Sequence, residues 1–157
     1  MATYNVADVF EKKSAPLIPD WRIRRILDDD KDNLINPSLT DVHTVGLSRY
    51  PAGKELQCVI DFSDDVLAWV INSIAFLIQQ GYELKDGDVI EGVFEDMPVK
   101  LQSTIHGLGK TDIEMLRIIV PDTEGRFPDD VECENDFKFQ LLATPELYGI
   151  NSPRFYS

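Results

Sequence analysis

The sequence is poor in the residues that most often build reactive or metal-binding sites. Its 157 residues include only two cysteines and two histidines. Cys58 and Cys133 form no CxxC pair, so the sequence predicts neither a zinc site nor redox chemistry. The HExxH, GxSxG and Walker patterns are absent as well. We therefore expect no bound metal and no cofactor.

Positive charge and long apolar runs are also scarce. The chain has 15 lysines and arginines against 28 aspartates and glutamates, a net charge of -13. Such a chain repels phosphate backbones, which argues against nucleic acid as a partner. No segment approaches the roughly 18 apolar residues that cross a bilayer, and the first 20 residues lack a signal-peptide core. We expect a cytoplasmic protein without membrane contact, and solubility alone is one explanation of its acidity.

The composition that remains is that of one globular domain. Apolar residues make up 43% of the chain, close to the globular average. Segments rich in β-forming residues surround one amphipathic helix, which predicts an α+β domain with a largely antiparallel sheet packed on that helix. We expect the family-like core to span residues 42–143 of the single domain 1–157, with 1–20 and 144–157 peripheral. The predicted strands cover 21–27, 42–50 (interrupted by Gly46), 56–62, 89–95, 99–104 and 113–120.

The helix is the clearest element. Apolar residues recur at spacings of three and four between Val66 and Ile78, Ser63 is a suitable N-cap, and Gly81 suits the left-handed end. We expect a helix over residues 64–80. The segment 28–41 is predicted as turn and loop, 6–12 as a short helix, and 137–143 as a strand or a short helix. Cys58 falls in the strand 56–62, where we expect it to be buried.

The histidines are the first candidates for chemistry. His43 lies in a predicted strand and His106 in the loop HGLGK. A histidine acting as general base needs a carboxylate or hydroxyl partner in space, which spacing alone does not reveal. An enzyme or ligand site would require His43, Thr44, Asp122 and Arg126 to converge in one pocket, with His43 and Arg126 as catalytic residues. The alternative is a strand histidine with a satisfied hydrogen bond.

The stretch PDTEGRFPDD and its continuation are the most distinctive part of the sequence. Gly125 permits a positive φ, Arg126 can pair with Asp122 or Glu124, and Phe127 can close the edge of the core. The acidic continuation is either a solvated loop or a surface that docks a basic protein. The candidate partner-binding residues are Asp129, Asp130, Glu132 and Glu134.

Three phrases taken together resemble a family of bacterial proteins of unknown function, DUF4262. They are HTVGLSRY with ELQCVI, the segment from FSDDVLAWV to MPVKLQ, and RIIVPDTEGRFPDD, in the order of the family and covering residues 42–143. The resemblance implies small, cytoplasmic, single-domain bacterial proteins without an established activity. Two positions depart from the family pattern: His43 replaces an aromatic residue and Asp129 replaces a tryptophan. The matching motif positions are Thr44, Gly46, Leu47, Pro121, Asp122, Gly125, Arg126, Phe127 and Pro128.

Three classes of function remain open. The main hypothesis is a non-catalytic acidic binding protein, for instance an immunity or inhibitor protein that covers a basic toxin or effector. The alternative is an enzyme or small-ligand-binding domain with a pocket near His43 and Thr44. The third is a structural or regulatory domain of an oligomer, whose subunit number the sequence leaves open.

Overall fold

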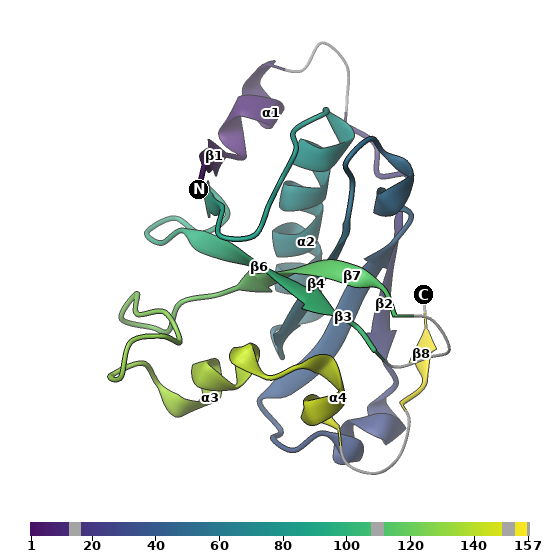
Figure 1. The fold of residues 1–157 in the computed structure, drawn as a ribbon, viewed down its shortest axis with the longest axis vertical. Coiled ribbons are helices and arrows are strands. Elements are labelled where there is room, and N and C mark those ends of the chain that lie inside the picture. Colours follow the sequence, from purple (N-terminus) through teal and green to yellow (C-terminus); the bar gives the residue numbers. More distant parts are fainter. Residues whose placement is uncertain (13–16, 108–111, 149–152, 157) are drawn as a thin grey trace.

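The protein folds around one eight-stranded mixed sheet in the order β1-β5-β6-β7-β4-β3-β2-β8 (Figure 1). The computed structural model describes residues 1–12, 17–107, 112–148 and 153–156. Five of the seven strand pairs are antiparallel, while β1 with β5 and β4 with β7 run parallel. The α+β class with a largely antiparallel sheet is thus confirmed. The strands are β1 (Thr3–Asn5), β2 (Arg22–Ile26), β3 (Leu39–Val45), β4 (Glu55–Ile60), β5 (Val89–Glu91), β6 (Val99–Ile105), β7 (Glu114–Ile119) and β8 (Phe155–Tyr156).

Helix α2 (Asp64–Gln79) packs on one face of the sheet and is the long helix that the sequence predicts. The Ser63 hydroxyl oxygen accepts a hydrogen bond from the Val66 N–H at 3.4 Å, which caps the first turn. Gly81 follows the last turn with φ of +99°. No helix among the described residues has the length and apolar character to cross a membrane.

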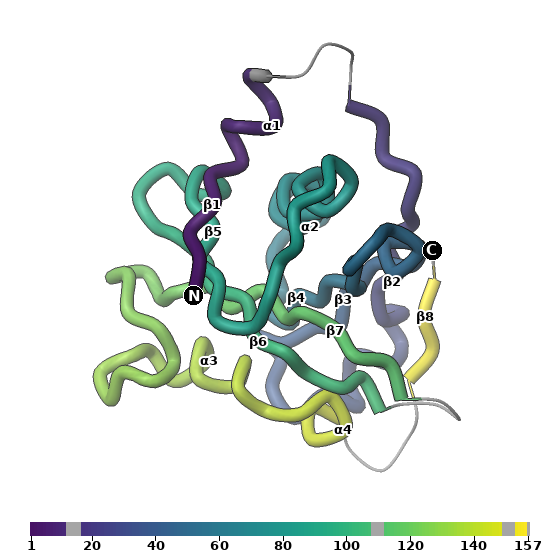
Figure 2. The backbone as a smooth tube through the Cα atoms, turned by 45° about the horizontal axis from the view of Figure 1, so that its top comes forward, coloured from purple at the N-terminus to yellow at the C-terminus, as the bar shows by residue number. Residues whose placement is uncertain are grey.

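The opposite face of the sheet is covered by the chain that follows β7 (Figure 2). It contains α3 (Asn135–Lys138), a 3-10 turn (Phe139–Leu141) and α4 (Thr144–Leu147), so the ambiguous segment after residue 136 is helical. Two apolar clusters result from this layering. One joins α2 to residues such as Cys58 and Leu116, and the other joins Val59 to Leu147 on the far side. Neighbouring strand residues thus face different layers, as the alternation of a strand requires.

Both end segments belong to the fold, contrary to the expectation that they are peripheral. At the N-terminus, β1 pairs with β5, and Val6 and Val9 enter the larger core beside α1 (Ala7–Lys12). At the C-terminus, Leu147 and Tyr148 are buried in the second core and β8 pairs with β2. Short, broken elements of this kind have weak local sequence patterns, although tertiary contacts bury them.

Strand β3 also begins earlier than predicted. The sequence NPSLTD suggested a loop up to residue 41, but Leu39, Thr40 and Asp41 are fully buried strand residues. Tertiary burial here overrides the low strand propensity of aspartate. The strand ends at Val45 because Gly46 takes φ of +121°, and a 3-10 turn (Leu47–Arg49) replaces the predicted strand continuation.

Candidate functional site

A buried carboxylate, Asp41, is the centre of the candidate site. Leu39 lies opposite Ile60 and Val42 opposite Cys58, so one extra residue of β3 bulges out of the pairing where Asp41 lies. The Asp41 side chain is fully buried. Its Oδ1 accepts a hydrogen bond from Gln57 Nε2 at 3.0 Å, and its Oδ2 accepts one from the Tyr148 hydroxyl at 2.7 Å.

Two imidazoles approach the same carboxylate. His106 Nε2 lies 3.2 Å from Asp41 Oδ2, and His43 Nδ1 lies 3.5 Å from Asp41 Oδ1. The two rings are 4.8 Å apart between centroids, and the ring of Phe155 lies 5.1 Å from that of His43. The only two histidines of the chain therefore meet at one acid, although 63 residues separate them in the sequence.

A row of polar residues crosses the sheet beside this acid. Arg24, His43, Gln57, Arg117 and Gln102 lie opposite one another in register on β2, β3, β4, β7 and β6. The buried polar members of this row need hydrogen-bond partners, and Arg117 and Gln57 bond to each other.

Arg117 is a buried member of this row and bonds to several neighbours. Its side chain is 1% exposed, and Nε donates to Gln57 Oε1 at 2.9 Å. Because Oε1 is held in this way, the Gln57 amide must turn its NH2 group toward Asp41. The Arg117 guanidinium also donates to the Gln140 carbonyl at 2.7 Å and to the Thr144 hydroxyl at 3.0 Å. Asp41 is thereby tied to the segment that covers this face.

The burial of the site shifts the acidity of its members. Burial raises the pKa of Asp41, but the contacts with His106 and His43 outweigh it and hold that pKa well below its usual range. Burial and the neighbouring negative charge of Asp41 raise the pKa of the Tyr148 hydroxyl far above its usual value. Burial lowers the pKa of Arg117 to about 10, which leaves it cationic at neutral pH. Asp41 is thus ionised and Tyr148 is a hydrogen-bond donor.

A cavity of about 640 Å³ opens beside the histidines. Its polar wall contains Arg24, His43, Thr44, Ser48, Glu55 and His106, and its apolar wall contains Val45, Ile113, Met115 and Phe155. Cavities of this size, mostly apolar with a few convergent polar groups, are typical of small-ligand sites.

Glu55 lines the cavity but already has its partners. Oε1 accepts hydrogen bonds from the Thr44 hydroxyl at 2.7 Å and the Leu47 N–H at 3.0 Å. Oε2 accepts from the N–H groups of Ser48 and Gly46 at 3.0 and 3.2 Å. Burial raises the pKa of Glu55, but these donors outweigh it and lower that pKa overall. Thr44, a predicted motif residue, therefore binds Glu55 and builds the turn after β3.

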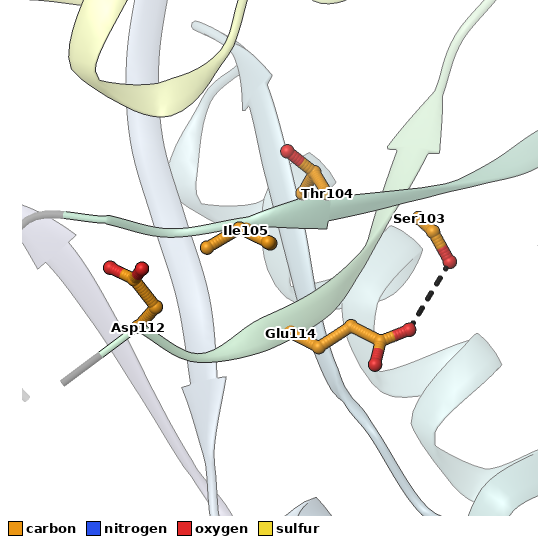
Figure 3. Close-up of a pocket in the computed structure, with 5 residues that line it drawn as sticks. All are labelled: Ser103, Thr104, Ile105, Asp112 and Glu114. Carbon is orange, nitrogen blue, oxygen red and sulfur yellow. Dashed lines mark hydrogen bonds between the residues drawn. The ribbon is translucent and has the colours of Figure 1, made fainter.

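A second cavity of about 410 Å³ lies over the outer ends of β6 and β7. Figure 3 shows Ser103, Thr104, Ile105, Asp112 and Glu114 around it. The Ser103 hydroxyl donates to Glu114 Oε1 at 3.5 Å, so these two groups pair with each other. Ile105 is exposed. No buried polar group of the described residues points into this cavity, so it is the weaker candidate.

Asp122 and Arg126 lie elsewhere. They follow the C-terminal end of β7, and neither lines the cavity that His43 and Thr44 share. Arg126 Nε lies 3.1 Å from Asp122 Oδ2, so the predicted pairing of these two residues is confirmed. The convergence of all four residues, which the sequence hypothesis required, is not observed. Arg126 therefore has no place in this candidate site.

Asp122 organises the loop that follows β7. Oδ1 accepts hydrogen bonds from the N–H groups of Glu124 and Arg126, both at 2.9 Å, and Oδ2 accepts one from Glu134 at 3.0 Å. Gly125 has φ of +82°, as predicted. The ring of Phe127 is half-buried beneath Lys100 Nζ at 4.2 Å. The motif is thus a structured loop.

The acidic residues proposed for partner binding all lie on this loop and are exposed: Asp129, Asp130, Glu132 and Glu134. Between them, Val131 is 86% exposed. Cys133 is buried beside them, and burial together with the Asp122 charge raises the pKa of its thiol. Cys58 is fully buried, as predicted, and burial raises the pKa of its thiol to about 11.

Sequence reasoning missed four members of the site. The sequence predicts a loop at Asp41 and does not single out Gln57, Arg117 or Tyr148 as site residues. A signal was present, because His43, Gln57 and Arg117 each interrupt an otherwise apolar strand in VHTV, LQCVI and MLRIIV. Their meeting depends on strand register and on a bulge, which the sequence did not reveal.

Comparison with known proteins adds no relative. No family model, no curated protein and no solved structure matches the chain. The resemblance to DUF4262 stays a prediction.

Proposed function

We propose that the protein binds a small organic anion in the cavity beside β3 and that His43 and His106 exchange protons with it. The observation that carries this proposal is the convergence of both histidines on one buried carboxylate at the wall of that cavity. Histidine is the side chain most often used for general acid–base chemistry, and a carboxylate partner can orient it.

Arg24 indicates the sign of the ligand. It lines the cavity, and its side chain makes no hydrogen bond or ion pair with any residue that the structure describes. Its guanidinium is therefore available to a ligand in the cavity. An anionic group of a ligand would pair with the Arg24 guanidinium. Ile113, Met115 and Phe155 would contact the apolar part of the same ligand.

The proposal is tested by screening small carboxylates and phosphate esters against the purified protein by thermal shift and calorimetry. We expect at least one class to bind and Arg24→Met to weaken it by about tenfold or more, as loss of a charged hydrogen bond does. Arg22→Met is the matched control, since Arg22 is exposed on the same strand and outside the cavity. Equal affinity in both variants would reject the assignment of the anion to Arg24.

A second candidate function is the docking of a basic protein, such as a toxin or effector, on the acidic loop. Asp129, Asp130, Glu132 and Glu134 flank the exposed Val131 in sequence, and Asp122 accepts a hydrogen bond from the Glu134 N–H of this segment. A held backbone lowers the entropic cost of binding, and the carboxylates would accelerate encounter with a cationic surface. An immunity or inhibitor protein would use such a surface.

This second function is tested by charge reversal. Replacing the four acids by lysine should abolish capture of a basic partner from the native cell and should remove the salt dependence of its association rate. The matched control reverses four acids elsewhere on the surface, Asp28, Asp32, Glu83 and Glu95. Capture by the loop variant at the level of the control would exclude this surface.

A further inference from the structure

The strongest unassigned feature is an unpartnered nitrogen inside the histidine cluster. The His43 side chain is 8% exposed, yet its Nδ1 has no hydrogen-bond partner among the described residues. Asp41 Oδ1 is 3.5 Å away but not in a hydrogen-bonding orientation. Leaving such a nitrogen unbonded costs stability, which calls for an explanation.

We propose that Asp41, His43 and His106 bind one divalent transition-metal ion, with Zn²⁺ as the reference ion. One ligand atom from each residue lies within 4.8 Å of the others. Ions of this class lie about 2.1 Å from imidazole nitrogen and carboxylate oxygen, so neighbouring ligand atoms are roughly 3.0 to 3.4 Å apart. His106 Nε2 lies 3.2 Å from Asp41 Oδ2 and His43 Nδ1 lies 3.5 Å from Asp41 Oδ1, both close to that spacing. The ligand atoms lie within 4.8 Å of one another, so the side chains would draw together slightly around the ion.

The chemistry of the donors selects the class of ion. Two imidazoles with one carboxylate suit Zn²⁺, Co²⁺, Ni²⁺ or Fe²⁺, whereas Mg²⁺ and Ca²⁺ prefer oxygen ligands. The remaining coordination positions would face the cavity, because His43 and His106 both line it. A protein that supplies three ligands leaves room for a water or an anion on the ion, as catalytic metal sites do.

The residues around the three ligands already have the arrangement of an outer shell. Gln57 and Tyr148 each donate to a different oxygen of Asp41, which holds the carboxylate in place. Arg117 in turn fixes Gln57. Hydrogen bonds of this kind orient metal-binding carboxylates and are needed for full affinity. An ordinary hydrogen-bonded cluster would explain the His106 contact but not the bare Nδ1 of His43.

The inference shares only the cavity with the proposed function: with the ion bound, His43 and His106 are ligands and no longer exchange protons with the anion, which would instead meet the ion and Arg24. Metal binding is measurable without any organic ligand. The experiment is calorimetric titration of chelator-treated protein with Zn²⁺ in excess Mg²⁺, which occupies surface carboxylates. Visible absorption of the Co²⁺ form then reports nitrogen ligation. We expect one ion per chain, and we expect His43→Gln and His106→Gln to weaken binding by about 100-fold or more.

Asp41→Asn and Asp122→Asn form a matched pair, because each neutralises one buried carboxylate. The first should lose the ion and the second should keep it. Circular dichroism shows whether each variant is folded, and if Asp41→Asn unfolds, the two histidine variants decide. Absence of stoichiometric Zn²⁺ uptake, or uptake unchanged by both histidine variants, would overturn the metal site. Anion binding that depends on Arg24 without metal would leave the proposed function standing, whereas metal uptake without anion binding would leave only the metal site.

Discussion

Asp41 on β3 and Asp122 just after β7 are both buried aspartates, and their partners differ in kind. Asp122 is bonded by backbone N–H groups and one arginine, all within twelve residues of it. Asp41 is bonded by side chains, and its partners His106 and Tyr148 lie 65 and 107 residues away. Asp122 thus shapes a local loop, whereas Asp41 gathers distant reactive groups. A buried acid alone does not mark a site; the identity of its partners does.

The largest effect on stability should come from Arg117, which fixes the Gln57 side chain that donates to Asp41. Arg117→Met removes a buried guanidinium, leaves Gln57 Oε1 and the Gln140 carbonyl without this donor, and takes away one of the two donors to the Thr144 hydroxyl. We expect the free energy of unfolding to fall by about 3 to 5 kcal/mol, measured by urea denaturation. Arg126→Met, in the Asp122 loop, is the comparison, and its loss should be smaller because that side chain is 33% exposed. A greater loss for Arg126→Met would reverse the ranking of the two regions.

The second effect is a dependence of stability on acid. Burial raises the pKa of Asp122, but its backbone N–H donors and Arg126 outweigh this and hold the pKa well below the usual range. An acid whose pKa is depressed in the folded state stabilises the fold above its unfolded pKa, about 3.9, and loses this contribution as pH falls toward its folded pKa.

Asp122→Asn should therefore reduce the free energy of unfolding at neutral pH. Below about pH 4, the variant should lose stability less steeply with falling pH, with a slope that corresponds to up to about one fewer proton bound on unfolding. Unfolding monitored by circular dichroism between neutral and acid pH measures both. The variant should still take up Zn²⁺ and the organic anion. An acid slope identical to that of the wild type would show that Asp122 carries no such contribution.

The smallest effect concerns the backbone of the loop. Gly125 has φ of +82°, and an added Cβ would meet only Met97 Sδ at 3.9 Å. Gly125→Ala should therefore cost about 1 kcal/mol through backbone strain alone. Gly81→Ala is the matched control, with φ of +99° and no atom within 4 Å of the added carbon. Thermal unfolding that shows a much larger loss at Gly125 would mean that the loop needs glycine for more than its φ.

The local partners of Asp122 and the distant partners of Asp41 also explain how well the sequence predicts each region. The Asp122 loop was predictable because glycine, arginine and proline act within a few residues of one another. Helix α2 was predictable from its apolar spacing and its cap. The Asp41 cluster was not, since it depends on a bulge in β3, on the register of four strands and on Tyr148 in a segment taken as peripheral. His43 was identified, but its partners needed the three-dimensional arrangement.

The long separation between Asp41 and Tyr148 has a consequence for how the chain folds. Contacts between distant residues form late, because closing a long loop costs entropy before the contact gives any return. The hydrogen bonds around Asp41 are therefore complete only once the segment around Tyr148 has docked, which requires the chain through Tyr148 to be present. A molecule or ion that binds at Asp41 and the two histidines therefore recognises only chains in which this segment has docked. It shifts the equilibrium away from partly folded chains by mass action.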